Sequence, residues 1–296
     1  MNANKHQNET LLITGASGFV GGHLIRAASA AGWHTAGFFH TSDLPSTSGC
    51  TAHHVDITDG NAVASAFDDL QPSVVIHCAA VAGIGICADD KHKATAVNIE
   101  GTRNIVESVA RTGAYLIYVS TDLVFDGVQG YYRECDPPAP ACYYGTTKYA
   151  GELITISSGC RYSIARLATV YGHGIGNSVN FLDKLLGQLQ RGETSELFDD
   201  EYRSFVFIDD VCVKLLKLAA DQMSGIFHIA GPERLSAYDF GLKVAKCHGF
   251  NKTLLHPISS YKHKRPQDCS LSNEKTIVQL GDFQSVEEVF AIQPEA

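Results

Sequence analysis

The stretch LLITGASGFVG, residues 11–21, joins an apolar run directly to a glycine-rich turn. Its first four residues predict a buried strand, and the apolar spacing of residues 19–31 predicts a helix. Between these elements the glycines Gly15, Gly18 and Gly21 have the spacing G-x-x-G-x-x-G. Such a turn lets backbone amides at the positive end of a helix approach a diphosphate closely. A tight turn without a ligand is the alternative, because a glycine triplet alone is a weak signal.

Strand and helix patterns alternate through the first half of the chain. A long helix is predicted over residues 93–111, and further short strands are predicted at 35–39, 53–55, 74–78, 115–120 and, in the second half, 226–230. These strands do not alternate polar and apolar residues, so they indicate an α/β fold with a doubly wound parallel sheet. Ligands bind beyond the carboxyl ends of such strands. We therefore expect the functional loops to follow Thr14, Phe39, Val55, Cys78 and Ser120.

The second half of the chain is less regular. Helical patterns at residues 181–191 and 209–221 flank a polar stretch. We predict a dinucleotide-binding domain at residues 1–171, with residues 205–245 returning to it in part. Most of residues 172–296 should form a smaller lobe that binds the substrate. We see no sharp linker between the two.

The composition of the 296-residue chain excludes several classes of protein. Its net charge of −9, from 23 Lys+Arg against 32 Asp+Glu, gives no basic surface for nucleic acid. Its apolar runs are far shorter than the ~20 residues of a membrane helix, and Met1–Thr10 lacks the apolar centre of a secretory signal. The nine cysteines are odd in number and include no Cys-x-x-Cys pair, which argues against disulfides and against a bound metal. We expect a cytoplasmic protein that binds neither nucleic acid nor membrane.

Tyr144 and Lys148 have the spacing Tyr-x-x-x-Lys. On a helix, residues four apart share a face, so the ammonium can lower the tyrosine pKa from ~10 toward neutrality. The phenol can then act as an acid or base in proton transfer. Alone, this spacing arises by chance too often to indicate a function.

The segment VSTDLVFDG, residues 119–127, lies at the carboxyl end of the last predicted strand of the first half. A hydroxyl at this edge, such as that of Thr121, can hydrogen-bond a substrate carbonyl oxygen. Taken alone, Ser-Thr-Asp is more typical of a turn or a helix cap.

Together these motifs resemble the extended short-chain dehydrogenase/reductase family over nearly the whole chain. Further matching segments are HCAA at 77–80, NIEGT at 98–102, Arg166 with VYG at 170–172, RSFVFIDDV at 203–211 and RPQD at 265–268. The likeness is greatest to the dTDP-4-dehydrorhamnose reductase branch, through residues 120–127 and 131–144. It implies a Rossmann-type domain with a smaller C-terminal substrate-binding lobe, and NAD(P)H-dependent reduction of a keto group on a nucleotide-activated sugar.

The resemblance also implies the roles of individual residues. Thr121 would polarise the carbonyl, Tyr144 would protonate its oxygen, and Lys148 would hold the ribose hydroxyls and lower the tyrosine pKa. The residues expected to bind the cofactor are Gly15, Ser17, Gly18, Phe19, Val20, Gly21, His40, Asp56, Ile57, Ala79, Ala80, Asn98, Tyr144 and Lys148. Those expected to bind the substrate are Asp122, Thr169, Arg203 and Arg265.

Arg203 and Arg265 match arginines that hold the diphosphate in nucleotide-sugar relatives. The alternative is a structural role, with Arg203 paired to Asp209 or Asp210 and Arg265 paired to Asp268.

Thr169 stands where reductases of the branch commonly carry tryptophan and epimerases carry asparagine. The substrate can therefore be a different keto sugar nucleotide or a smaller ketone.

The end of the second predicted strand bears on the cofactor. An acidic residue there would bind the ribose 2′-hydroxyl and repel a 2′-phosphate. Residues 39–42 read Phe-His-Thr-Ser, and no acid occurs before Asp43. This favours NADP(H) and leaves NAD(H) open, because no arginine is present. His40 is either a phosphate ligand or a plain surface residue.

Two other activities and one non-catalytic role are alternatives to reduction. Dehydratases of this superfamily carry Thr-Asp-Glu, and Leu123 in place of the glutamate counts against dehydration. Epimerases keep the tyrosine and lysine and tend to hold NAD tightly. A non-catalytic subunit similar to the β subunit of methionine adenosyltransferase is the alternative outside enzymes. Homodimers are common in the family, although no stripe in this sequence identifies an interface.

Overall fold

The computed structural model describes residues 9–42, 50–175, 180–261 and 265–292. Asp43, named above, lies outside the described residues. The chain divides into two compact units. Unit 1 consists of Met1–Thr121, Tyr143–Ala165 and Cys212–Ile226, and unit 2 of Asp122–Cys142, Arg166–Val211 and Phe227–Ala296. The domain boundary predicted at residue 171 stays a prediction.

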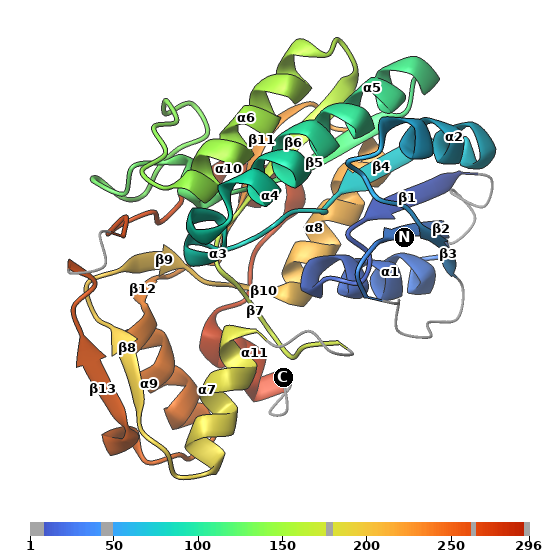
Figure 1. Ribbon diagram of the computed structural model, residues 1–296. Coiled ribbons are helices and arrows are strands. Elements are labelled where there is room, and N and C mark those ends of the chain that lie inside the picture. The colour runs from blue at the N-terminus through green and yellow to red at the C-terminus, as the bar shows by residue number, and fades with distance from the viewer. Residues whose placement is uncertain (1–8, 43–49, 176–179, 262–264, 293–296) are drawn as a thin grey trace. The chain divides into compact units, whose positions relative to one another are not determined.

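A seven-stranded sheet runs in the order β11-β6-β5-β4-β1-β2-β3 (Figure 1). The strands are β1 (Thr10–Thr14), β2 (His34–Phe39), β3 (Cys50–His54), β4 (Val74–His77), β5 (Tyr115–Thr121), β6 (Arg161–Leu167) and β11 (Gly225–Ile229). β1 pairs in parallel with β2 and with β4, and the next pairs outward, β2–β3 and β4–β5, are also parallel. The strand order therefore reverses between β1 and β4, which confirms the predicted doubly wound α/β fold.

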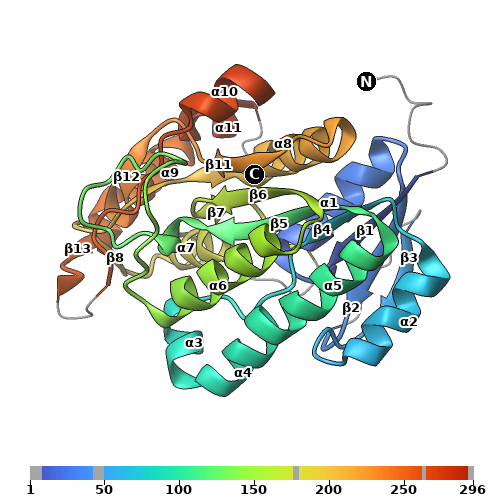
Figure 2. The same ribbon diagram turned by 90° about the horizontal axis from the view of Figure 1, so that it is seen from above.

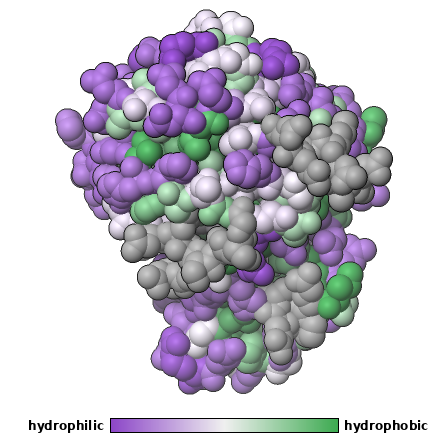
Figure 3. All heavy atoms as spheres, turned by 90° about the vertical axis from the view of Figure 1, so that its right-hand side faces the viewer, coloured by the Kyte–Doolittle hydropathy of each residue, from purple (hydrophilic) through white to green (hydrophobic). Residues whose placement is uncertain are grey.

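Helices cover this sheet within unit 1. Figures 1 and 2 show α2 (Gly60–Leu70) and α5 (Thr102–Thr112) on one face and α1 (Phe19–Ala30) on the other. The core between the sheet and helices α2 and α5 includes Leu12, Phe38, Phe67, Val75 and Ile105. Asp59 caps α2 through its carboxylate, which satisfies two amides of the first turn. On the surface shown in Figure 3, apolar side chains lie in small groups among polar ones.

The helix predicted over residues 93–111 is divided into three segments. α4 (Lys91–Thr95) passes into a π-helical turn, η1 (Ala96–Gly101), which continues as α5. A π turn accommodates an extra residue and often occurs at functional sites. Apolar periodicity did not reveal it, because the pattern resumes beyond the turn.

The third strand also differs from the prediction. It begins at Cys50, three residues before the predicted start at residue 53, and most of its residues are exposed at the edge of the sheet. An edge strand of this kind has no buried apolar run that would mark its extent.

The described residues of unit 2 form three two-stranded sheets: β10 (Val206–Phe207) with β7 (Val170–Tyr171), β12 (Arg234–Ser236) with β9 (Tyr202–Ser204), and β13 (Leu255–Ile258) with β8 (Ser195–Phe198). Its helices include α7 (Phe181–Gln190), α9 (Ala237–Cys247), α10 (Glu274–Leu280) and α11 (Val286–Ile292). Phe205 and Phe240 stack at 4.3 Å between ring centroids, and Tyr171 packs edge-on against Phe240.

Helix α8 (Ile208–Asp221) begins in unit 2 and continues into unit 1. The polar stretch after α7 contains β8 and β9, which are too short for their pattern to be recognised in the sequence. None of the helices in the described ranges is long and apolar enough to cross a membrane.

Candidate active site

The turn between β1 and α1 brings three backbone segments into close contact. Gly15 has a φ of +65°, and a Cβ atom there would lie 2.7 Å from Cα of Ala79. A Cβ atom on Gly21 would lie 2.2 Å from the carbonyl oxygen of Gly15. Gly18 begins α1 without a side-chain cap, which leaves first-turn amides for an anion. This cradle fits the diphosphate of a dinucleotide.

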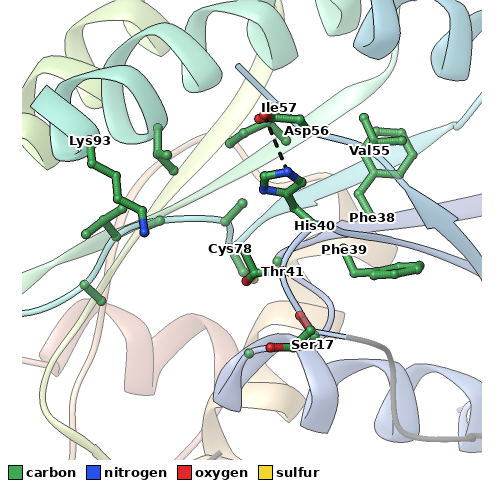
Figure 4. Close-up of a pocket in the computed structure, with 18 of the residues that line it drawn as sticks. Ser17, Phe38, Phe39, His40, Thr41, Val55, Asp56, Ile57, Cys78 and Lys93 are labelled. Atoms are coloured by element: carbon green, nitrogen blue, oxygen red, sulfur yellow. Dashed lines mark ion pairs between the residues drawn. The ribbon is translucent and has the colours of Figure 1, made fainter. Parts of the chain in front are cut away.

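A cavity of about 460 Å³ lies in unit 1 at this turn (Figure 4). Of the residues predicted to bind the cofactor, those that line it are Gly15, Ser17, Gly18, His40, Asp56, Ile57, Ala79 and Ala80. Those absent from the lining are Phe19, Val20, Gly21, Asn98, Tyr144 and Lys148. The cavity thus gathers the carboxyl ends of β1, β2 and β4, as expected for a doubly wound sheet.

His40 and Asp56 face each other in this cavity, with His40 Nε2 3.6 Å from Asp56 Oδ2 (Figure 4). Asp56 is held by Thr58, whose backbone amide and hydroxyl donate to Oδ1 at 2.9 and 2.8 Å. The hydrogen bond from the Thr58 backbone amide is the main reason that the pKa of Asp56 is lowered, and the charges of His40 and His54 act in the same direction. A carboxylate thus lies next to His40, although it comes from the segment after β3 and not from the end of β2.

Lys93 is a cavity residue that the sequence did not reveal. It is the one lysine among the described residues that line the cavity, and Figure 4 shows its side chain pointing into the space. Its position one helical turn before Val97, another lining residue, is the signal that could have indicated it.

A buried network fixes the end of β4 against β1 and the π turn. The Thr102 hydroxyl donates to the Asn98 carbonyl oxygen at 2.8 Å, so it accepts the bond from His77 Nε2 at 3.0 Å. His77 Nδ1 then accepts a hydrogen bond from the Thr14 hydroxyl at 2.6 Å. The oxygen of that hydroxyl accepts a bond from the Ala79 amide at 3.2 Å. Burial lowers the pKa of His77 to about 3, which agrees with this neutral tautomer.

The side chain of Asn98 connects the loop after β4 to α6 (Tyr143–Ser157). Its amide group donates to the Val81 carbonyl and to the Thr147 hydroxyl, both at 2.9 Å, and its oxygen accepts from the Val81 amide at 2.8 Å. The Thr147 hydroxyl in turn donates to the Tyr144 carbonyl at 2.8 Å. Asn98 therefore supports both the cavity wall and the first turn of α6.

Tyr144 and Lys148 lie one turn apart on α6, which packs against β5, the strand that ends at Thr121. The Lys148 ammonium lies 4.3 Å from the ring centroid of Tyr118, and the Tyr118 hydroxyl donates to the Lys148 carbonyl at 3.1 Å. Burial lowers the pKa of Lys148 to about 8, an effect that nearby Cys78, Glu152 and Cys87 oppose. The predicted i, i+4 face is thus present, with the lysine almost completely buried.

Glu152, a further turn along α6, is a second residue that sequence reasoning missed. It is fully buried and accepts a 2.5 Å hydrogen bond from the Ser120 hydroxyl. The signal was the repeated spacing of four residues after Tyr144 and Lys148.

Asp122, Arg203 and Arg265 lie together in unit 2, around Glu201. The two terminal nitrogens of Arg203 donate four hydrogen bonds: Nη1 to the Tyr202 and Gln267 carbonyls, and Nη2 to Glu201 and the Pro266 carbonyl. Its Nε forms a longer ion pair with Asp122, at 3.7 Å. Arg265 holds Glu201 through both Nε and Nη2.

The pairings predicted for the structural alternative are wrong. Asp268 pairs with Arg234 at 2.7 Å, and Asp210 accepts a bond from the Gln284 amide. Glu201 is the residue that takes both arginines, and it was missed because it lies far from Arg265 in the sequence.

Thr169 is not part of this cluster. It lies directly before β7, is half-buried, and its carbonyl oxygen accepts a bond from the Val206 amide at 3.0 Å.

The chain matches the model of the RmlD substrate binding domain over residues 9–287. It belongs to the RmlD substrate binding domain family. Membership confirms the resemblance found in the sequence motifs. The match spans both units.

Among the relatives of this RmlD-family chain, a probable low-salt glycan biosynthesis reductase of Haloferax volcanii is 32% identical over 246 residues, which are 82% of this chain and 81% of that protein. Methionine adenosyltransferase 2 subunit beta of Pongo abelii is 28% identical over 277 residues, 90% of this chain and 81% of that protein. dTDP-4-dehydrorhamnose reductase of Streptomyces griseus is 33% identical over 217 residues, 72% of this chain and 66% of that protein.

One solved structure with the same fold is dTDP-4-dehydrorhamnose reductase from Bacillus anthracis str. Ames in complex with NADP. It has a TM-score of 0.84 and 24% identity, and the match covers 96% of this chain and 98% of that chain. This likeness supports the fold of the RmlD-family chain described above.

Proposed function

We propose that this protein is an NAD(P)H-dependent oxidoreductase that reduces a keto group, on a nucleotide-activated sugar of the dTDP-4-dehydrorhamnose type. The observation that carries the proposal is the arrangement of unit 1. Tyr144 and Lys148 share one face of α6, β5 ends at Thr121, and the glycine cradle lies at the reversal of strand order. The names of two relatives, both reductases, support it.

The protein's own part in the reaction is binding and proton transfer. The Thr121 hydroxyl donates a hydrogen bond to the substrate carbonyl oxygen, and the Tyr144 phenol gives that oxygen its proton. The positive charge of Lys148 stabilises the phenolate that remains. A bound reduced nicotinamide supplies the hydride.

The cofactor would be held by the glycine cradle, by the cavity beside it and by Lys148 at the ribose hydroxyls. NADP(H) is favoured because β2 ends without an acid, and the related structure with NADP agrees with this choice. Asp56 beside His40 leaves NAD(H) open. Lys93 adds a cation for the phosphates on the wall opposite His40.

For the substrate diphosphate we favour Arg265 over Arg203. Both terminal nitrogens of Arg203 already donate to groups of unit 2, its Nε is paired with Asp122, and the residue is buried. Arg265 is about one-third exposed, and the described residues leave its Nη1 for a ligand. Asp122 is placed by Arg203, and Thr169 is the position that would select the sugar.

A screen of keto sugar nucleotides with NADPH and NADH, followed by absorbance of the reduced nicotinamide, tests the proposal. Consumption of reduced cofactor with a keto sugar nucleotide is the expected result. Interconversion of sugar epimers without net cofactor consumption would instead identify an epimerase. Leu123 in place of a glutamate argues against dehydration.

A non-catalytic regulatory subunit is the second candidate, because several of the relatives are named methionine adenosyltransferase 2 subunit beta. Under this alternative the protein would form a stable complex with a catalytic methionine adenosyltransferase chain and change its kinetics. Size-exclusion chromatography of the mixed proteins, run beside the reductase screen, separates the two functions. A complex without any turnover would support the regulatory role.

A further inference from the structure

Glu152 is a buried acid that the proposed mechanism does not use. It follows Lys148 by one turn, so Tyr144, Lys148 and Glu152 fall on one face of α6. Its side chain is 0% exposed, although burial of a carboxylate is costly unless the group is hydrogen-bonded and balanced by charge. The Ser120 hydroxyl donates one bond to it, at 2.5 Å. The negative charge of a buried carboxylate also requires a nearby cation, and Lys148 is the cation on the same face of α6.

Three other polar side chains near Lys148 in the described part of the chain, those of Cys78, Cys87 and His77, carry no charge at neutral pH. Burial raises the pKa of the Cys78 thiol to about 12. The thiol of Cys87, on α3 (Ile84–Asp89), donates to the Val81 carbonyl at 3.2 Å and is therefore protonated. His77, on β4, is neutral because burial lowers its pKa to about 3.

The two tyrosines near Lys148 lead to the same conclusion. Burial raises the pKa of Tyr118 well above its ordinary value, and the charges of Tyr144 and Glu152 act in the same direction. The ring of Tyr118 therefore presents a neutral face to the ammonium at 4.3 Å. Tyr144 is the group whose proton the lysine is meant to control. Among the described groups that favour the ammonium, Cys78, Cys87 and Glu152, the carboxylate of Glu152 is therefore the one that supplies a negative charge.

We propose that Glu152 is a positioning residue that keeps the side chain of Lys148 protonated and, through Ser120, fixes Thr121 relative to α6. This inference rests on the proposed reductase function. Ser120 directly precedes Thr121 at the end of β5, so its bond to Glu152 joins the strand to the helix that carries Tyr144 and Lys148. One carboxylate thus acts on all three catalytic residues without touching substrate or cofactor.

Two variants separate the charge of Glu152 from its hydrogen bond. Glu152→Gln keeps an acceptor oxygen for Ser120 and removes the charge. Ser120→Ala keeps the charge and removes the bond. Thermal unfolding of both variants identifies any loss that comes from misfolding.

The first measurement needs no substrate. Full-length protein labelled with ¹³C-lysine is titrated by NMR, and the Lys148 signal is assigned by its loss in Lys148→Arg. We expect Glu152→Gln to lower the pKa of Lys148 by one unit or more, and Ser120→Ala to change it much less. An unchanged pKa of Lys148 in folded Glu152→Gln would overturn the proposal.

The second measurement is the pH profile of kcat for the keto substrate. Activity that needs the Lys148 ammonium is lost as the pH rises through the pKa of Lys148. The alkaline limb of the profile of Glu152→Gln should therefore lie at least one pH unit lower than that of the wild type. At pH 8 the variant should retain about one-tenth or less of its own activity at pH 6. Ser120→Ala should lower kcat at all pH values without moving the limb. If the alkaline limb of Glu152→Gln stays at the wild-type pH, the proposed effect of the Glu152 charge on Lys148 is contradicted. Absence of turnover in the wild-type protein would instead refute the proposed reductase function and would leave the NMR result valid.

Discussion

The residues of this site differ in how many of their polar groups already form hydrogen bonds within the protein. Arg203 donates four hydrogen bonds within unit 2, and His77 is fixed as one neutral tautomer by two threonines. Such residues hold the structure, and their replacement would damage folding before chemistry. Tyr144, Phe39 and Arg265 are only partly buried, so substitutions at these positions test function more cleanly.

Tyr144→Phe should remove most turnover and leave cofactor affinity nearly intact. The phenyl ring keeps its packing, whereas loss of a general acid typically costs ~10²–10⁴-fold in rate. Steady-state kinetics with the keto substrate give kcat, and fluorescence titration gives the Kd for NADPH. A kcat close to that of the wild type would remove Tyr144 from the mechanism.

Phe39→Asp should shift the cofactor preference toward NADH. Phe39 ends β2 and lines the cavity beside His40, so a carboxylate there would repel a 2′-phosphate. The measurement is kcat/KM for NADPH and for NADH in both proteins. A wild-type enzyme that is at least tenfold better with NADH would show that the strand end was misread.

Arg265→Ala should raise KM for a keto sugar nucleotide by tenfold or more, in line with the ~1.5–3 kcal/mol of a charge-assisted hydrogen bond. Reduction of a small ketone without phosphate serves as the control and should hardly change. Equal losses on both substrates would mean that Arg265 acts through Glu201, to which it is bonded, and holds unit 2 together.

At the scale of elements, the turn between β1 and α1 depends on close backbone contact. A Cβ atom on Gly21 would overlap the Gly15 carbonyl, so the backbone would have to shift to accept a side chain there. The π turn is a comparable element, because it places Asn98 between the loop after β4 and α6.

Gly21→Ala should weaken NADPH binding by tenfold or more and lower the free energy of unfolding by about 1–3 kcal/mol, because the new Cβ would overlap backbone. Gly85→Ala is the matched control, since a Cβ atom there meets nothing within 4 Å. Isothermal titration and urea unfolding measure the two quantities. Equal behaviour of the two variants would show that the turn is more plastic than its packing indicates.

At the scale of the whole molecule, buried neutral histidines connect stability to pH. Burial lowers the pKa of His77 in unit 1 and of His228 in unit 2 to about 3. In the unfolded chain the pKa of a histidine is ~6.5. Between about pH 3 and pH 6.5 the unfolded chain therefore binds protons that the folded chain does not. Stability should therefore fall as pH drops below 6.5, by about 1.4 kcal/mol per pH unit for each histidine.

Urea unfolding at pH 7.5, 6.0 and 5.0 measures this acid dependence. His77→Gln should flatten the slope by about one proton even where it lowers the stability at neutral pH. His92→Gln, at an exposed position, should leave the slope unchanged. A His77→Gln protein with the same slope as the wild type would contradict the assignment.

The sequence by itself determined the fold class, the glycine turn and the shared face of Tyr144 and Lys148. Each depends on contacts between residues close in the chain, so strand length, glycine spacing and helical periodicity are sufficient to predict them. The cytoplasmic location and the domain boundary at residue 171 stay predictions.

Only the tertiary structure decided which polar groups meet. Glu201 bonds Arg265 from 64 residues away, and Glu152 bonds Ser120 across 32 residues. Asp56 reaches His40 from the segment after β3. The physical reason is that a buried polar group must find a partner wherever the folded chain provides one, and local sequence patterns do not specify that partner.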